Sequence, residues 1–420
     1  MASADQGSGK KKAILTGITT NVLVLGIVSL LTDVSSEMIY PILPMFLGAI
    51  GASALVIGFI EGAAETTASL LKVVSGWYSD RFKKRKPFIT AGYGTSTLVK
   101  PLLALAASPW QVLGLRIVER VGKGVRSAPR DALIADSVDK EHRGIAFGFH
   151  KSMDSTGAVI GPILVLPILL SAAAVTEDTY RTVFLLSTIP ALLAVLVIIF
   201  FVRDKEASGE GQIGKFSREL RQLGRPFYLL LVIVIVFYLG EVSYVFFILR
   251  AYDAGLTLGS LDKEVSAVVL YILYNVIFVI VAMPAGKLSD MLGRKPVIAL
   301  SFSIFAITCL TMAFAETLML AALGFALFGV YKGSSEGVLK AYVVDVAPGN
   351  LRGTALGGFH TAMGLVMLPG GIIAGLLYDT YGPPTAFAFG AVMAGLALFL
   401  LLVIGPGRKP KVLDRVADIP

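Results

Sequence analysis

The chain has 420 residues, of which 55% are apolar and only 16% are charged. Soluble domains have about 25% charged residues, so this composition excludes an ordinary soluble enzyme and indicates a membrane protein. The single cysteine, Cys309, excludes an internal disulfide, and three histidines without a second thiol exclude a zinc cluster of the usual spacing.

Apolar runs between turn residues predict an all-α membrane protein with twelve transmembrane helices. In chain order the first six cover residues 15–47, 51–78, 87–107, 109–134, 145–172 and 182–202. The polar stretch 203–225 is predicted to be a linker, and the second six helices cover 226–250, 264–288, 296–315, 318–341, 353–379 and 384–404. The expected domains are therefore two six-helix bundles, one in residues 1–202 and one in residues 226–420.

The formal net charge of +8 could indicate a nucleic-acid partner, but the basic residues cluster in alternate connections between the predicted helices. The clusters lie at 10–12, 81–86, 203–225 and 408–415. The positive-inside rule places such connections in the cytoplasm. Both termini and the linker are thus predicted to be cytoplasmic, in a plasma or inner membrane. The lipid bilayer is the expected surrounding, and neither nucleic acid nor a cofactor is expected.

The two halves repeat a pattern of residues, which predicts two bundles related by pseudo-symmetry. The offsets between related residues lie between 208 and 210. The recurring groups are Gly76, Ser79 and Asp80 with Gly286, Ser289 and Asp290; Lys123, Gly124, Asp136, Arg143 and Gly144 with Lys332, Gly333, Asp345, Arg352 and Gly353; and Asp33 with Glu241.

The segment GWYSDRFKKRKP at 76–87 and its copy GKLSDMLGRKP at 286–296 resemble the signature loop of the major facilitator superfamily. The second copy matches the pattern G-x-L-x-D-x-x-G-R-K. The first copy has Tyr78 in place of the leucine and Lys83 in place of the second glycine, which predicts a different turn. Arg116 stands where the superfamily has an arginine in its fourth helix.

The resemblance implies a transporter with a central cavity and alternating access. It further implies that helices one, four, seven and ten line the cavity, while helices three, six, nine and twelve face outward. The segment Gly157-x-x-x-Gly161-Pro162 is similar to the start of the helix-five motif of antiporters, although the following Gly-Gly is missing. This partial match slightly favours efflux over uptake.

Charged residues inside the predicted helices are costly in a bilayer, so each needs a partner, an aqueous cavity or a function. The predicted helices six, nine and twelve have none in their interiors, and helix three has only Lys100. The charges instead concentrate in helices one, two, four, five, seven and ten. This distribution agrees with the cavity that the resemblance implies.

The carboxylates of these helices are candidates for proton coupling, because burial favours the neutral form of a carboxyl group and lets it exchange a proton near neutral pH. The alternative is that they form structural ion pairs with the basic face of helix four. The candidates are Asp33, Glu37, Glu61, Glu65 and Glu241.

The cations of helices four and ten are candidates for binding an anionic group, since guanidinium and ammonium groups suit carboxylate and phosphate. The alternative is that they only neutralise the acids of helices one and two. With their neighbours, the predicted substrate-binding residues are Arg116, Arg120, Lys123, Tyr238, Lys332 and Glu336. His150 and His360 are a weak metal signal, and no metal site is predicted.

The signature loops and the arginines that follow helices four and ten are candidates for gating, since their charges can pair across the seam between the bundles. These residues are Gly76, Asp80, Arg81, Arg143, Gly286, Asp290, Arg294 and Arg352.

We therefore expect a secondary active transporter, and not an enzyme. The solute would be small and polar or amphipathic, and anionic in one form of this hypothesis. Transport would be coupled to protons, and the protein would act as a monomer. The alternatives are a uniporter or anion exchanger without proton coupling, and a membrane sensor that does not transport.

Overall fold

The computed structural model describes residues 18–82, 84–139, 142–204 and 219–407, and all regular secondary structure in these ranges is helical. The N-terminal half contains α2 (Thr20–Ile39), α3 (Leu43–Ala49), α4 (Ala54–Phe82), α5 (Lys86–Leu103), α6 (Pro109–Asp136), α7 (Arg143–Ser171) and α8 (Glu177–Phe201). The C-terminal half contains α10 (Arg225–Leu239), α11 (Tyr244–Asp253), α12 (Lys263–Leu292), α13 (Arg294–Ala313), α14 (Leu318–Val346), η2 (Gly349–Leu351), α15 (Arg352–Tyr381) and α16 (Pro383–Ile404).

These elements confirm the predicted set of twelve membrane helices, with two of them broken. Ten segments in the described ranges are long and apolar enough to cross a membrane, and α2 with α3, like α10 with α11, counts as one segment. The remaining two helices are α5 and α6, and α6 is less apolar because it has a row of charged side chains.

The first and seventh spans were predicted to be continuous, and both predictions are wrong at one point. The chain turns at residues 40–42, where Pro41 has no N–H to continue the hydrogen-bond ladder of α2. It leaves the helix again at residues 240–243. Gly240 packs so closely on α16 that a Cβ there would lie 2.2 Å from the Met393 Cβ. The second break places Glu241 outside regular helix.

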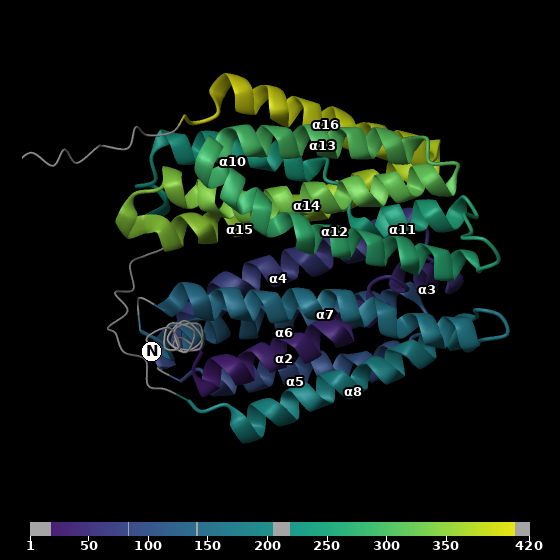
Figure 1. Cartoon of the computed structure of the whole chain (residues 1–420), viewed down its shortest axis with the longest axis horizontal. Helices are drawn as coiled ribbons and strands as arrows, with labels where there is room; N and C mark the ends of the chain where they lie inside the picture. The colour runs from purple at the N-terminus through teal and green to yellow at the C-terminus, as the bar shows by residue number, and fades with distance from the viewer. Residues whose placement is uncertain (1–17, 83, 140–141, 205–218, 408–420) are drawn as a thin grey trace, which may run out of the picture.

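The helices form two bundles that lie side by side, α2–α8 in purple to teal and α10–α16 in teal to yellow (Figure 1). Related positions in the two bundles keep the same ion pair. Arg85 Nε lies 3.8 Å from Asp136 Oδ2 in the first bundle, and Arg294 Nε lies 2.9 Å from Asp345 Oδ2 in the second. The predicted residue limits of the bundles stay a prediction, because 205–218 lie outside the described residues.

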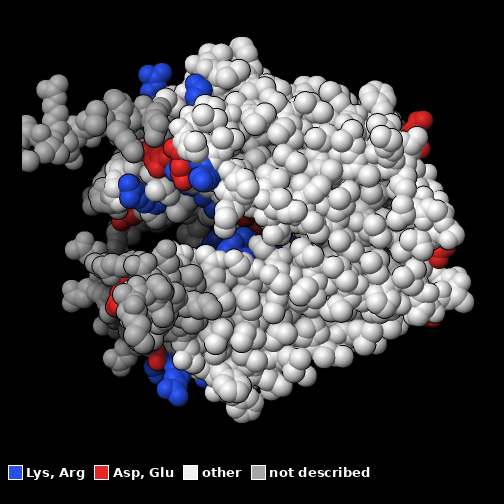
Figure 2. Space-filling view, viewed as in Figure 1, with Lys and Arg blue, Asp and Glu red and all other residues white. Residues whose placement is uncertain are grey.

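The outer surface of the bundles is largely apolar, as a bilayer requires. Large apolar side chains are exposed on α5, α8, α13 and α16, for example Leu98, Phe200, Leu310 and Phe399. These are helices three, six, nine and twelve, which were expected to face outward. In the view of Figure 2 this surface is almost free of charge.

The two ends of the bundles differ in their connections. At one end, Asn21 Nδ2 donates to the Arg203 carbonyl at 3.0 Å, and Lys295 Nζ donates to the Gly405 carbonyl at 3.1 Å. We call this the linker end, because α8 ends and α10 begins there. The opposite end, where α3 ends and α4 begins, is called the far end.

Candidate functional site

A cleft separates the two bundles at the linker end, and Lys and Arg side chains are visible inside it (Figure 2). In its inner part the bundles enclose a cavity of about 300 Å³. The first bundle contributes α4 and α6 to the wall, and the second contributes α10, α14 and α15. The ionisable lining residues are Glu65, Lys72, Lys123, Tyr238, Lys332, Glu336, Lys340 and His360.

Several residues that the sequence singled out meet in this cavity although they are far apart in the chain. They are Glu65, Lys123, Tyr238, Lys332 and Glu336. Sequence reasoning did not assign Lys72, Lys340 or His360 to the site. The helical spacing held a signal for two of them, since Lys72 follows Glu65 by seven residues and Lys340 follows Glu336 by four.

The far end is closed by a direct contact between α4 and α15. A Cβ at Gly371 would lie 2.4 Å from the Gly58 carbonyl oxygen, so only glycines fit at this crossing. Asp379, close to the end of α15, accepts hydrogen bonds from the N–H groups of Ala54 at 2.9 Å and Leu55 at 2.8 Å. A carboxylate at the N-terminus of a helix is favoured by the helix dipole. The contact between α4 and α15 therefore closes the cavity toward the far end.

Two tyrosines of the second bundle contact carboxylates of the first bundle. Tyr271 Oη donates to Glu37 Oε2 at 2.8 Å, and Tyr244 Oη lies 3.5 Å from Glu61 Oε1. Both contacts join the two bundles, so they depend on the closed state of the far end.

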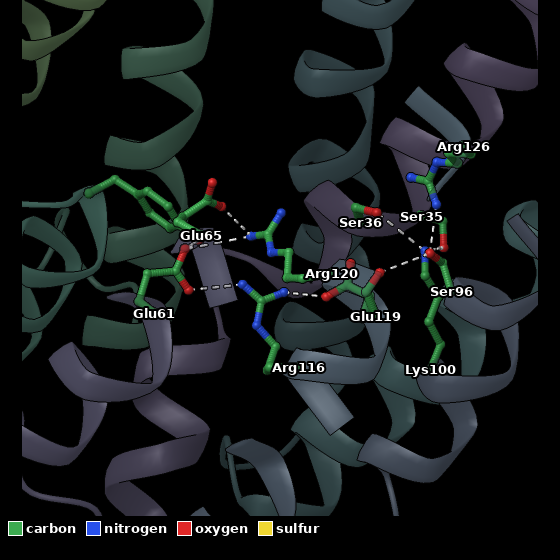
Figure 3. A network of polar contacts seen from close by, with 11 residues as sticks. Ser35, Ser36, Glu61, Glu65, Ser96, Lys100, Arg116, Glu119, Arg120 and Arg126 are labelled. Atoms are coloured by element: carbon green, nitrogen blue, oxygen red, sulfur yellow. Dashed lines mark hydrogen bonds and ion pairs between the residues drawn. The ribbon is translucent and has the colours of Figure 1, made fainter. Parts of the chain in front are cut away.

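The arginines predicted to bind substrate form a buried ion-pair network inside the first bundle (Figure 3). Arg116 Nη2 lies 2.8 Å from Glu61 Oε2, and its Nη1 donates to Glu119. Arg120 Nη2 lies 2.8 Å from Glu65 Oε1. The side chains of Arg116 and Arg120 are only 0% and 2% exposed. Because carboxylates of α4 and α6 contact both guanidinium groups, this geometry favours the structural alternative for these two arginines, with two acids of the second helix and Glu119 as their partners.

The network continues to a buried lysine on a helix that faces the lipid. Lys100 of α5 is 1% exposed, and its ammonium group donates to Ser35 and lies 3.4 Å from Ser36 Oγ. Arg126 Nη1 donates to Ser96 Oγ at 2.6 Å (Figure 3). Lys100 therefore points into the bundle, although the outer side of α5 is apolar.

The predicted pair Asp33 and Glu37 lies against α7. A Cβ at Gly157 would be 2.9 Å from the Asp33 Cβ, and one at Gly161 would be 2.7 Å from the Glu37 Cβ. The G-x-x-x-G segment thus provides the close helix approach that such spacing allows. It brings Asp33 within hydrogen-bonding reach of Asp154.

Asp154 was not among the candidates from the sequence, but both of its carboxylate oxygens accept hydrogen bonds. Its Oδ1 accepts a hydrogen bond from Ser29 Oγ at 3.0 Å, and its Oδ2 accepts one from Lys151 Nζ at 2.8 Å. Lys151 in turn lies 6.0 Å from the ring of Phe278 in α12. This group therefore lies where the first bundle meets the second.

The second bundle holds its acids in smaller clusters. Glu241, at the break between α10 and α11, accepts hydrogen bonds from Lys332 Nζ and, at 2.7 Å, from Tyr331 Oη. Lys340 Nζ donates to Glu336 Oε1 at 2.9 Å. Lys340 of α14 therefore pairs with Glu336 one turn away, while Lys332 pairs with Glu241.

Among the candidate gating residues of the second bundle, Arg294 forms ion pairs at the linker end. Arg294 donates to Asp290 Oδ1 at 2.5 Å and to Asp345 Oδ2 at 2.9 Å. Gly293, between α12 and α13, has φ of 98°, which explains the glycine of the signature pattern. A pocket of about 520 Å³ at the mouth is lined by Arg294 and Asp345 together with Lys72 and Asp131 of the first bundle.

The other gating candidates are less informative. Arg143 and Arg352 are exposed at the starts of α7 and α15, and neither makes an ion pair within the described residues. Gly286 lies in α12, and a Cβ added there would meet open space. The side chains of Asp80 and Arg81, the surroundings of Gly76, and residue 83 of the first signature loop lie outside the part that the structure describes.

Two bundles of six membrane helices around a shared cavity define a membrane transporter, and comparison with known proteins agrees. The sequence matches the profile of the Major Facilitator Superfamily over residues 25–281 and 261–418. A protein of Methanocaldococcus jannaschii named as an uncharacterized MFS-type transporter is 35% identical over 401 residues, which cover 96% of this chain and 99% of that protein. The chain therefore belongs to the major facilitator superfamily.

Solved structures share the fold at low sequence identity. A POT family transporter in complex with 5-aminolevulinic acid aligns with a TM-score of 0.77 at 12% identity, covering 92% of this chain and 96% of that one. A D-xylose-proton symporter aligns with a TM-score of 0.74 at 18% identity, covering 93% of this chain and 98% of that one. These likenesses confirm the twelve-helix, two-bundle fold.

Proposed function

We propose that the chain is a proton-coupled secondary transporter for a small solute with a negative charge, which it moves by alternating access. The observation that carries this proposal is the cavity of about 300 Å³, which both bundles line and which the α4–α15 seam closes at the far end. In this arrangement the linker end faces the cytoplasm, and a single copy of the chain contains the whole path.

The solute charge is inferred from the lining. Four lysines face the cavity, against two carboxylates, Glu65 and Glu336. Glu65 is bound to Arg120 and Glu336 to Lys340, so neither is free to neutralise further cations. A cation inside a membrane protein needs a counter-charge or water, and an anionic solute supplies the first.

In alternating access, the α4–α15 seam at the far end would open and the cleft at the linker end would close. Opening the far end requires that the Asp379 contact with α4 and the Tyr271 contact with Glu37 break. Closing the linker end brings the wall with Arg294 toward the wall with Asp131, which already line one pocket. This assigns the predicted gating residues Asp290 and Arg294 to the second step.

Proton coupling is assigned first to Glu37. Its hydrogen bond from Tyr271 joins the two bundles, and such a bond is stronger to an ionised carboxylate than to a neutral carboxyl group. Protonation of Glu37 weakens this bond and so favours opening of the far end. Glu61, Glu65 and Glu241 are held by arginine or lysine in this state, which makes them less suited to carry a proton. Asp33, beside Asp154, remains a second candidate.

The test uses purified protein in proteoliposomes. A thermal-shift screen of organic acids selects a solute, and its uptake is then followed with and without an imposed pH step. We expect the pH step to drive accumulation in the wild type, and the Glu37→Gln variant to exchange solute but not to accumulate it. A wild-type flux that is the same with and without the pH step would contradict proton coupling.

The same experiment examines an anion exchanger, which the ion pairs of Glu61, Glu65 and Glu241 also favour. An exchanger would move the solute only against an anion on the other side of the membrane. Direction is examined in the same vesicles, and the partial helix-five pattern favours efflux.

A further inference from the structure

The cavity has two chemically different walls, and this difference indicates the shape of its ligand. The wall from the first bundle has charged and hydroxyl groups from α4 and α6. The part of the wall that α15 contributes is mostly apolar and consists of Phe359, Met363 and Met367, with His360 beside them. Phe359, Met363 and Met367 are spaced four residues apart, so they lie on one face of α15.

Lys72 and Lys123 lie close together on the charged wall. A Cβ at Gly124 would be 2.6 Å from the Leu71 Cβ, and Ser75 Oγ donates to the Gly124 carbonyl at 2.7 Å. The turn of α6 that holds Lys123 therefore lies against the turn of α4 that holds Lys72.

These two ammonium groups differ from the other lysines of the cavity. Lys332 is bound to Glu241, and Lys340 is bound to Glu336. Among the described residues, no side chain forms an ion pair or a hydrogen bond with the ammonium group of Lys72 or of Lys123. Two neighbouring cations without a direct ion-pair partner repel each other and favour an anion that both can contact.

We propose that the cavity binds an amphipathic organic anion with its charge at one end. The anionic group, a carboxylate or a phosphate, lies between Lys72 and Lys123. The apolar part packs on Phe359, Met363 and Met367, where the flexible methionine side chains accommodate different shapes. This inference rests on the proposed function and specifies its substrate class.

Such a ligand would join the two bundles, because its charged end contacts the first bundle and its apolar end contacts the second. A short inorganic anion satisfies only the lysines, and a neutral apolar compound satisfies only α15. Both ends are therefore required for strong binding. This requirement gives the proposal a test that needs no proton gradient.

The experiment measures binding to the purified full chain by equilibrium dialysis. The probes are 2-naphthoate and 2-naphthyl phosphate, with 2-naphthamide as the neutral analogue and acetate and inorganic phosphate as anions without an apolar part. We expect 2-naphthoate or 2-naphthyl phosphate to bind at least about tenfold more tightly than the other three, as the loss of a charge-assisted hydrogen bond predicts. Which of the two binds better identifies the anionic group.

The variants Lys72→Gln and Lys123→Gln should each weaken binding of the charged naphthyl probes by about tenfold. Lys287→Gln is the matched control, because Lys287 is an exposed lysine of α12 outside the cavity lining. Lys123→Arg keeps the charge and should keep most of the binding. Met363→Ser should weaken binding of the naphthyl anions, since it removes apolar contact area.

The proposal is overturned if 2-naphthamide binds as tightly as 2-naphthoate, if none of the probes binds, or if both lysine variants bind like the wild type. Thermal unfolding of each variant shows whether it is folded. If a glutamine variant does not fold, binding of the naphthyl anions to Lys123→Arg tests the proposal independently. Failure of proton coupling has a different signature. In that case the naphthyl anions bind, but a pH step does not drive their transport.

Discussion

The buried network of α6 and the lysine-lined cavity are both rich in charge, yet they solve the problem of charge in a membrane protein differently. In the network, Arg116 and Arg120 are almost completely buried, and each contacts at least one carboxylate. In the cavity, Lys72 and Lys123 reach open space without such a partner. The network uses planar guanidinium groups, of which Arg116 contacts two carboxylates through separate nitrogens and Arg120 binds Glu65 through Nη2, whereas the cavity uses flexible ammonium groups.

The difference teaches that the number of charges on a helix does not identify a binding site. A cation whose hydrogen bonds are already made to carboxylates stabilises the bundle and has little left for a solute. A cation in a hydrated cleft contributes little to stability but remains free to bind. The comparison can be tested by changing one region at a time.

The largest effect is expected for Arg116→Ala. It leaves the carboxylates of Glu61 and Glu119 buried without their main cation, and breaking a buried ion pair in this way costs about 3–5 kcal/mol. The thermal unfolding midpoint of the purified protein should fall strongly. Arg225→Ala is the control, since Arg225 is exposed at the start of α10. An unchanged midpoint for Arg116→Ala would contradict the difference between the buried network and the cavity.

A smaller effect, mainly on conformation, is expected for Gly371→Leu. The new side chain meets the backbone of Gly58 and forces the seam apart, at a cost of about 1–3 kcal/mol to the state with a closed far end. If the bundles rock, the cleft then closes and hides its lining. A cysteine introduced as Ser127→Cys in a Cys309→Ser background should react more slowly with a membrane-impermeant maleimide.

Gly395→Leu is the control for this prediction, because a Cβ at Gly395 meets open space. Equal labelling rates in Gly371→Leu and Gly395→Leu would show that the seam and the cleft are not linked. A faster rate in Gly371→Leu would show that they move together and not in opposition.

The smallest effect is expected for Glu241→Gln, which sharpens the comparison within the second bundle. The Lys332 side chain is 25% exposed, so water in the cavity can solvate its charge, and the glutamine oxygen still accepts its hydrogen bond. The loss of stability should be about 1 kcal/mol. Thermal unfolding measured beside Arg116→Ala checks this, and a loss as large as that of the arginine variant would contradict it.

Much of the fold could be read from the sequence because the bilayer imposes strong local rules. Apolar runs of sufficient length predicted the spans, and the repeat predicted the two bundles. The breaks at 40–42 and 240–243 were not predicted. Pro41 was a signal for the first break, whereas the need for glycine at 240 arises from Met393, a residue distant in the sequence. A smaller part of the site than of the fold was predicted from the sequence. The predicted residues that line the cavity, such as Glu65 and Lys123, were recognised by their helical spacing.

The sequence by itself determined that the chain is a twelve-helix membrane protein with two related halves and with charges on the inner helices, because hydropathy and helical period act within one segment. Only the tertiary structure decided which charges are paired. Arg116 and Lys123 lie on the same stripe of α6, yet one meets carboxylates in the bundle and the other meets a cavity. That outcome depends on which side chains of α4, α14 and α15 lie opposite, and helical spacing within one segment has no information about the opposing surface.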